Sequence, residues 1–277
     1  MPQRAVPPRA CSRAPPPLRR LHRAPQPRRL PASAMSTGGA GAGDGAPIGN
    51  FNRARSSVAA ERNTAPIVET VVRLLGADAR GRVRLRRGAA RLLPCALARS
   101  SPFVAPQALE VASGTGQHVA ALAAALPGLE WQPTEVSADA FADIEAHASG
   151  RANVRAPLLL DAAEAWPAAV GRDLAAVLCV NLTHISAWRV TLGLVAGAGA
   201  ALRPGGMLLI YGPFLVDGVA TTESNAAFDA SLRASNAEWG YRDRGVVAAE
   251  ALKAGLHTVE MVAMPANNFL LAFRKAG

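Results

Sequence analysis

The sequence lacks several features that would define common protein classes. Among its 277 residues there is no apolar run of the about 20 residues that a membrane-spanning helix needs. Its three cysteines, Cys11, Cys95 and Cys179, lie far apart and form no C-x-x-C motif, and its five histidines do not cluster. We therefore expect a soluble protein with no disulfide framework, no metal and no membrane partner.

Acidic residues are scarce in two segments, and these segments carry the excess positive charge. The net charge is +10, but residues 1–35 hold eight arginines and no acid, and residues 78–99 hold seven arginines and one aspartate. The rest of the chain therefore sums to −4. Because the basic charge is confined to these segments, we do not expect a nucleic-acid partner.

The composition predicts one folded domain behind a non-globular N-terminal region. Residues 1–35 are rich in Arg and Pro and should be disordered. They are typical of an organellar transit peptide, or translation starts at Met35. Residues 36–55 form a Gly/Ala-rich linker, and residues 56–277 the domain. An Arg-rich stretch at about 77–106 is too long for an ordinary connection, so we interpret it as an exposed insertion or a retained intron.

The expected location follows from the same N-terminal region. The protein should be cytoplasmic, or lie in a chloroplast or mitochondrion if residues 1–35 are a genuine transit peptide. The sequence leaves the oligomeric state open.

The most informative motif is the stretch Leu109–His118, in which an apolar strand leads through a small-residue turn into a helix. A dinucleotide-binding G-x-G-x-x-G fingerprint would need glycine where Val119 stands. The pattern E-x-G-x-G-x-G fits better, with Ala112 in the first glycine position. That pattern is the nucleoside loop of S-adenosylmethionine (SAM) enzymes. The expected cofactor contacts in this loop are Glu110, Ala112, Ser113, Gly114, Gly116 and Gln117.

Three further apolar runs are each followed by a polar residue, namely Glu135, Asp161 and Asn181. Such runs, separated by helical segments, predict a parallel sheet whose carboxyl ends share one edge. Glu135 follows Gly116 by nineteen residues, close to the spacing at which an acid binds ribose hydroxyls. We expect these three residues and Val136 to contact the cofactor. For each acid alone, helix capping or solvation is the competing interpretation.

Two β-rich runs at 257–264 and 268–274 flank the turn residues Pro265-Ala266-Asn267 and predict a hairpin at the sheet edge. Before them, helices are predicted at 228–239 and 246–254, the second ended by a glycine. A turn at 202–206 should precede the strand at 207–212.

The chain resembles the methyltransferase-like protein 26 family, also called domain of unknown function 938, within the class I SAM-dependent methyltransferases. The blocks that carry the resemblance are Ala59–Asn63 with Pro66-Ile67, Leu109–His118, Trp131–Pro133, Asn181–Ser186, Tyr211–Phe214, Ser224–Asp229, Glu238–Gly240, Arg242-Asp243 and Met264–Asn268. The resemblance implies a Rossmann-like α/β fold, with a seven-stranded, mainly parallel sheet, helices on both faces and an antiparallel last strand. It implies SAM as cofactor and leaves the methyl acceptor, a small molecule or a protein, unidentified.

The candidate chemistry lies after the fourth strand, at Asn181-Leu182-Thr183-His184. This is not the Asp/Asn-Pro-Pro-Tyr/Phe tetrapeptide of many amino-group methyltransferases. Methyl transfer mainly requires alignment of the reacting atoms, and a base only if the acceptor is protonated. His184 is the best available base, with Asn181 orienting the acceptor, unless His184 caps the following helix. Residues expected at the acceptor pocket are Arg62, Asn63, Tyr211, Asn225, Asn267 and Asn268, with a solvated helix face as the alternative for the first two.

Three functions therefore stay open. The first is an active SAM-dependent methyltransferase (EC 2.1.1.-), and the second is a SAM-binding module without activity. The third, a nicotinamide-dependent oxidoreductase, is disfavoured by Val119 and by the lack of a Tyr-x-x-x-Lys pair after the fourth strand. The sequence does not separate the first two.

Overall fold

The computed structural model describes residues 61–75 and 105–277. The N-terminal extension, the linker and nearly all of the Arg-rich insertion lie outside these residues, as do Cys11 and Cys95. Within the described part, no helix is long and apolar enough to cross a bilayer. The same residues contain no group of three His, Cys, Asp or Glu side chains placed to hold a metal ion.

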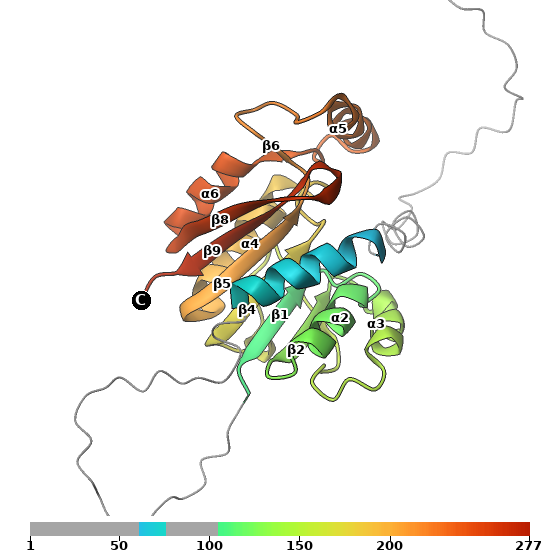
Figure 1. Cartoon of the computed structure of the whole chain (residues 1–277), viewed down its shortest axis with the longest axis vertical. Helices are drawn as coiled ribbons and strands as arrows, with labels where there is room; N and C mark the ends of the chain where they lie inside the picture. The colour runs from blue at the N-terminus through green and yellow to red at the C-terminus, as the bar shows by residue number, and fades with distance from the viewer. Residues whose placement is uncertain (1–60, 76–104) are drawn as a thin grey trace, which may run out of the picture. The chain divides into compact units, whose positions relative to one another are not determined.

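A seven-stranded sheet forms the centre of the described domain (Figure 1). Its strand order is β3-β2-β1-β4-β5-β9-β8. Strand β9 runs antiparallel to both of its neighbours, and all the other pairs are parallel. The strands are β1 Gln107–Val111, β2 Glu130–Glu135, β3 Leu158–Leu159, β4 Leu174–Val180, β5 Leu202–Gly212, β8 Leu256–Met264 and β9 Asn268–Lys275. The predicted sheet with its antiparallel last strand is confirmed.

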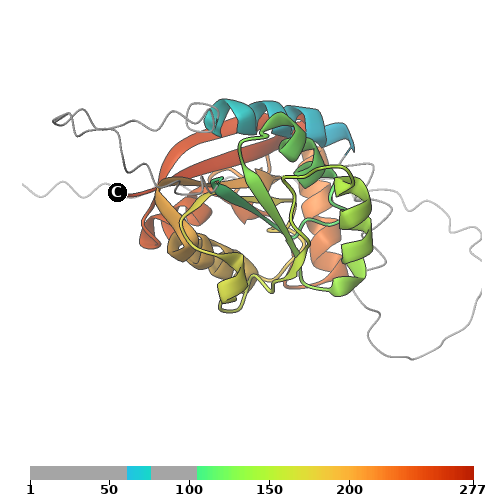
Figure 2. The same cartoon turned by 90° about the horizontal axis from the view of Figure 1, so that it is seen from below.

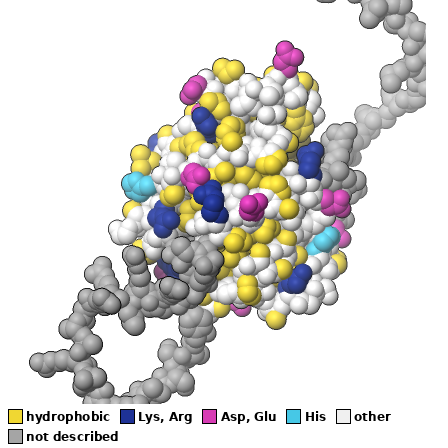
Figure 3. Space-filling model, in the orientation of Figure 1, with side chains coloured by type: hydrophobic (Ala, Val, Ile, Leu, Met, Phe, Trp, Pro, Cys, Tyr) yellow, Lys and Arg dark blue, Asp and Glu magenta, His cyan; other side chains and the backbone are white. Residues whose placement is uncertain are grey.

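Helices cover both faces of the sheet (Figures 1 and 2). One face carries the helical residues 61–75, drawn in blue, with α2 (Gln117–Ala125) and α3 (Phe141–Ala148). The other carries α4 (Trp188–Ala201) and α6 (Arg244–Lys253). On the face seen in Figure 3, basic and acidic side chains of the described residues are interspersed.

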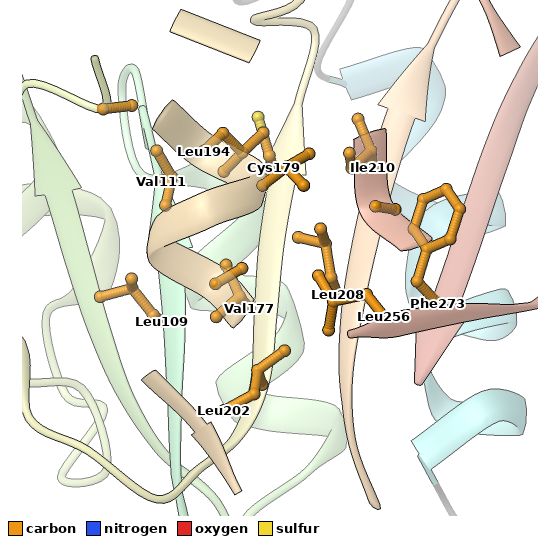
Figure 4. Close-up of a cluster of buried hydrophobic side chains, with 14 of the residues drawn as sticks. Leu109, Val111, Val177, Cys179, Leu194, Leu202, Leu208, Ile210, Leu256 and Phe273 are labelled. Atoms are coloured by element: carbon orange, nitrogen blue, oxygen red, sulfur yellow. The ribbon is translucent and has the colours of Figure 1, made fainter. Parts of the chain in front are cut away.

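The long apolar runs of the central strands arise because their side chains enter two separate cores. In β4, Val177 and Cys179 pack toward α4, whereas Leu178 packs toward the helix at 61–75. This alternation is the period of two that every strand imposes. Figure 4 shows Cys179 beside Leu194 of α4 in the first of these cores. Cys179 is fully buried and is a small core residue.

Local capping residues shifted two helix boundaries from those predicted. The helix expected at 228–239 is α5, Glu223–Ser235, because the Thr222 hydroxyl accepts from the Asn225 N–H and starts the helix earlier. Likewise α6 begins at Arg244, because the Asp243 carboxylate accepts from the first helical N–H groups.

The fifth strand also begins earlier than expected. Leu202 already pairs with Leu174 of β4, and the register then shifts before Met207 resumes the pairing with Ala176. Gly205, at φ 79°, supplies the left-handed backbone within this shift. The C-terminal hairpin is confirmed, and Ala266 and Asn267 form its turn at φ 57° and 56°.

Between β5 and α6 the chain leaves the sheet. Strand β6 (Phe214–Leu215) pairs with β7 (Arg242–Asp243), and α5 lies between them in sequence. Because β6 starts two residues after β5, this excursion sits at the carboxyl end of the sheet, where α5 is seen in Figure 1.

Candidate functional site

The strand order reverses between β1 and β4, and the carboxyl ends of strands at such a point bind ligands in open α/β sheets. The residues directly after these two strands share an unusual backbone. Ala112 follows β1 and Asn181 follows β4, each at φ 58°. Left-handed non-glycine residues cost about 1–3 kcal/mol and concentrate at functional sites. The two left-handed residues therefore lie at the same strand ends at which the reversal of strand order predicts a ligand site.

The glycine loop after β1 is tied to β2. The Ser113 N–H donates to the Thr134 carbonyl at 2.9 Å, and the Thr134 hydroxyl donates to the Glu110 carbonyl at 2.8 Å. Gly116, at φ 85°, has a reason of its own to be glycine, since a Cβ there would lie 2.8 Å from the Ile144 Cα atom in α3. The loop is thus rigidly placed above the end of the sheet.

Glu135 is the last residue of β2, and its carboxylate is bonded to this loop. Its Oε1 accepts from the Gly114 N–H at 2.7 Å and its Oε2 from the Val136 N–H at 3.0 Å. Burial raises the pKa of Glu135, and these two backbone donors lower it. The next side chain, Val136, is 67% exposed, which leaves an apolar surface open beside the carboxylate.

Glu110, at the end of β1, is a buried carboxyl. Burial raises its pKa to about 8; the Ser113 hydroxyl and the Val119 N–H work against this, and the charge of Glu135 adds to it. Its Oε2 atom has no hydrogen-bond partner. A carboxyl in this state would be stabilised in its charged form by a cationic ligand group.

Unpartnered polar atoms concentrate at these two strand ends. In the described residues, eight buried side-chain polar atoms lack a partner; one of them belongs to Glu110 near the end of β1, and four belong to the segments after β1 and β4. Leaving such an atom unsatisfied costs about 1–3 kcal/mol, so a cluster of them indicates a site completed by a polar ligand. The five are Glu110 Oε2, Gln117 Oε1, His118 Nε2, Thr183 Oγ1 and His184 Nδ1.

His118 is a member of this cluster that the sequence analysis did not select. It lies in the first turn of α2, and burial lowers its pKa to about 4. Its position in the sequence could have indicated this, because His118 follows Gly116 by two residues and therefore lies directly after the glycine loop.

His184 is buried in the loop between β4 and α4. Its ring lies edge-on to Phe228 and Tyr241, with centroids 6.2 and 6.1 Å away. Burial, and then the positive charge of Arg242, lower the pKa of His184 to about 4, so the ring is neutral near pH 7. The alternative that His184 caps α4 is wrong: Ala187 is the capping residue, and no side chain caps the helix.

Asn181 and His184 converge on the end of β5. A Cβ atom on Gly212 would lie 3.5 Å from His184 Nδ1 and 3.7 Å from Asn181 Oδ1. The structure therefore brings the two predicted catalytic side chains to one point, beside the strand end that the sequence analysis did not single out.

The expected acceptor-pocket residues fall into two groups. In the first, the Asn268 amide donates to the Tyr211 hydroxyl at 3.0 Å. Burial raises the pKa of Tyr211, and Asn268 and the nearby charge of Arg62 lower it. Arg62 is itself exposed and its Nε donates to Oδ1 of the buried Asn63 at 3.4 Å.

The second group makes local contacts of its own. The Asn225 amide donates to the Asn267 carbonyl at 3.3 Å and to the Thr221 hydroxyl at 3.1 Å, and Asn267 is exposed. Asp161, expected at the cofactor, is exposed after β3 and accepts from the Ala163 N–H at 2.8 Å, as a turn-capping carboxylate does.

The model of one protein family matches residues 91–275, and that family is described as a protein of unknown function, DUF938. The chain belongs to this family. The matched residues include the whole sheet, the glycine loop and both catalytic candidates, Asn181 and His184.

Solved methyltransferases share the fold of this DUF938 protein. An O-methyltransferase family protein from Burkholderia thailandensis matches with a TM-score of 0.54 and 21% identity, over 62% of this chain and 51% of its own. An O-methyltransferase family 2 protein from Planctomyces limnophilus, in complex with apigenin, gives 0.61 and 17%, over 83% and 62%. Human N-acetylserotonin methyltransferase in complex with SAM gives 0.53 and 14%, over 62% and 48%.

These identities show the fold alone, which is that of the Rossmann-like methyltransferases. The chain spans between 48% and 62% of the length of these three proteins.

Proposed function

We propose that this protein is a SAM-dependent methyltransferase, related within its family to methyltransferase-like protein 26. The observation that carries the proposal is the cluster of five unpartnered buried polar atoms at the ends of β1 and β4. The cluster occupies the ligand-binding point of a fold that its solved neighbours use for methyl transfer.

The residues present fit the parts of SAM. Glu135 offers a preorganised carboxylate to the ribose hydroxyls, and the exposed Val136 offers an apolar surface to the adenine. Glu110, with its unpartnered oxygen, suits the methionine ammonium. The remaining expected contacts are Ala112, Ser113, Gly114, Gly116 and Gln117 in the loop, Asp161 after β3 and Asn181 after β4.

When bound, SAM supplies a methyl group that is already activated by its sulfonium. The protein then has to align the acceptor and exclude water. Asn181 orients the acceptor, and the neutral His184 takes up the proton that the acceptor loses, at Nδ1. Arg62, Asn63, Tyr211, Asn225, Asn267 and Asn268 would contribute polar contacts to an acceptor that is a small molecule or a protein.

A SAM-binding module without transfer activity is the second candidate, and one observation favours it. A buried histidine whose pKa is lowered to about 4 holds a proton poorly, which weakens it as a base. The oxidoreductase hypothesis has no such support, since Val119 is fully buried where the dinucleotide fingerprint needs glycine.

Two measurements test the proposal in order. Calorimetry with S-adenosylhomocysteine and with nicotinamide dinucleotide should show binding of the first only. A screen with methyl-labelled SAM against fractionated metabolites and proteins should then transfer label to a defined acceptor. Binding without any labelled product would favour the inactive module, and no binding would refute the proposal.

A further inference from the structure

One arginine from a distant part of the chain, Arg242, forms hydrogen bonds to the loop that carries Asn181 and His184. Arg242, half-buried in β7, donates from Nε to the Thr183 carbonyl at 3.1 Å and from Nη2 to the Ser186 carbonyl at 2.6 Å. The same Nη2 donates to the Glu238 carbonyl at 2.7 Å. The two loop carbonyls lie on either side of His184, so the guanidinium fixes the backbone before and after that residue.

A second bond fixes His184 itself. Its carbonyl accepts from the Gly240 N–H at 3.0 Å, two residues before Arg242. Gly240 is at φ 129°, and a Cβ there would lie 2.5 Å from the Arg233 guanidinium carbon, so only glycine fits this position without rearrangement. The loop is therefore joined to Gly240 and Arg242 at three of its carbonyls, those of Thr183, His184 and Ser186.

This segment is anchored in turn to α5. The Asp229 carboxylate accepts from the Tyr241 N–H at 2.6 Å and from Arg233 Nε at 3.0 Å. Tyr241 and Phe228 supply the rings against the His184 side chain. A continuous set of contacts thus runs from α5 through the Arg242 segment to the imidazole.

Arginine suits this position better than any other side chain. Its planar fork presents several N–H donors at fixed angles, whereas a lysine ammonium is a point charge on a flexible stem. The guanidinium also lies 5.7 Å from the centre of the Trp188 ring, which begins α4 directly after the loop. The three hydrogen bonds of Arg242 to Thr183, Ser186 and Glu238 all go to backbone carbonyls, and none of the three goes to an acidic side chain.

We propose that Arg242 is a positioning residue, which fixes the β4–α4 loop so that Asn181 and His184 face Gly212. Its significance for catalysis rests on the proposed methyltransferase function. Its effect on the imidazole does not, because the position of His184 is measurable without any substrate.

The test compares the full chain with Arg242→Lys, which keeps the charge but loses the fork, and with Arg242→Gln, which loses both. Arg244→Lys is the matched control. Arg244 lies two residues after Arg242, but its guanidinium carbon is 5.1 Å from the centre of the Phe269 ring. Side-chain NMR of labelled histidine, assigned with His184→Gln, reports the environment and the pKa of each ring. Calorimetry with S-adenosylhomocysteine reports the cofactor site.

We expect both Arg242 variants to move the His184 resonances and to raise its pKa, because a loop without the fork exposes the ring and burial is the larger cause of the lowered pKa. The rise should be greater in Arg242→Gln, which also removes the positive charge. His118, which is buried in the first turn of α2, should be unchanged, and Arg244→Lys should leave both rings unchanged. Once an acceptor is known, Arg242→Lys should lower kcat by about tenfold with a smaller change in the KM for SAM.

Unchanged His184 resonances in a folded Arg242→Lys protein would overturn the proposal, even if its melting temperature fell. Because that variant keeps the charge, it remains decisive if Arg242→Gln fails to fold. Failure of the parent protein to bind S-adenosylhomocysteine would instead count against the methyltransferase function and leave the NMR result standing.

Discussion

The backbone N–H of Gly114 lies 2.7 Å from Oε1 of Glu135, so the glycine loop after β1 is bonded directly to the end of β2. The carboxylate is held by Val136 as well, through Oε2. Neither oxygen therefore needs to reorganise much when a ligand with two adjacent hydroxyls arrives, and such preorganisation is what a specific binding site requires.

We expect Glu135→Gln to weaken binding of S-adenosylhomocysteine by about tenfold or more, because hydrogen bonds to a charged acceptor contribute about 1.5–3 kcal/mol each. Calorimetry measures the loss. The matched control is Glu130→Gln at the other end of the same strand, where the carboxylate accepts from Gln107 at 2.9 Å. Equal effects of the two substitutions would remove Glu135 from the cofactor site.

Glu110 should couple cofactor binding to proton release. Its pKa of about 8 leaves it mostly protonated at about pH 7. An ammonium group placed against it would lower that pKa, so binding should release up to about one proton. Calorimetry with S-adenosylhomocysteine in two buffers of different ionisation enthalpy counts these protons. The difference between the binding enthalpies in the two buffers should vanish in Glu110→Gln. If the parent protein shows no such difference, the ammonium group binds away from Glu110.

The sequence predicted the sheet and the edge at which its polar strand ends meet, because both follow from patterns that are local in the chain. Glu110, Glu135 and Asn181 each lie at or directly after the carboxyl end of a strand, and the carboxyl ends of parallel strands lie at one edge of the sheet. The glycine loop was predicted from the spacing of Glu110, Gly114 and Gly116. Helix starts were less accurate because single capping residues, Thr222 and Asp243, set them.

The surroundings of His184 could not be read from the sequence. Phe228, Tyr241 and Arg242 lie more than forty residues farther along the chain, on the excursion after β5, and meet the histidine only through tertiary packing. The pKa of His184 follows from that packing. The role expected for Asp161 stays a prediction, since its carboxylate is seen bonded within its own turn.

Stability should depend on pH through the same buried groups. The pKa values of His118 and His184 fall from 6.5 to about 4 on folding, so below pH 6.5 the unfolded chain takes up protons that the folded protein refuses. Stability is then lost as the pH falls from 6.5 toward 4. Glu110 acts oppositely: its pKa rises from 4.5 to about 8, and stability is lost as the pH rises through that window.

These opposing contributions place the maximum of stability near pH 6.5, because the two histidines act only below that pH and Glu110 alone dominates above it. Glu135, whose pKa burial also raises, acts in the direction of Glu110 and weakens the pH dependence on the acid side. Denaturant unfolding at about pH 5, 6.5 and 8 should show the maximum, with differences of a few kcal/mol at most. His118→Gln should flatten the acid side. An acid side unaffected by His118→Gln would show that this histidine is not held neutral.

His184→Ala should lower turnover about 10²–10⁴-fold with little change in S-adenosylhomocysteine affinity, because it removes the proposed base. The buried ring also packs on Phe228 and Tyr241, so a lower melting temperature is expected as well. His184→Gln keeps most of the packing and separates the two effects. Near-normal turnover of a folded His184→Gln protein would assign the histidine a structural role.

Gly212→Ala provides the narrowest test of where the acceptor lies. The added methyl would make ordinary contacts at 3.5 Å with His184 Nδ1 and 3.7 Å with Asn181 Oδ1, so it fills the space between them without a clash. The position lies in β5, opposite Phe269 of β9, where alanine is tolerated, and the change in stability should stay below about 1 kcal/mol. We expect turnover to fall at least about tenfold while S-adenosylhomocysteine affinity changes little, and Gly212→Val to abolish turnover. If Gly212→Ala turns over as fast as the parent protein, the reacting atom of the acceptor does not lie between Asn181 and His184.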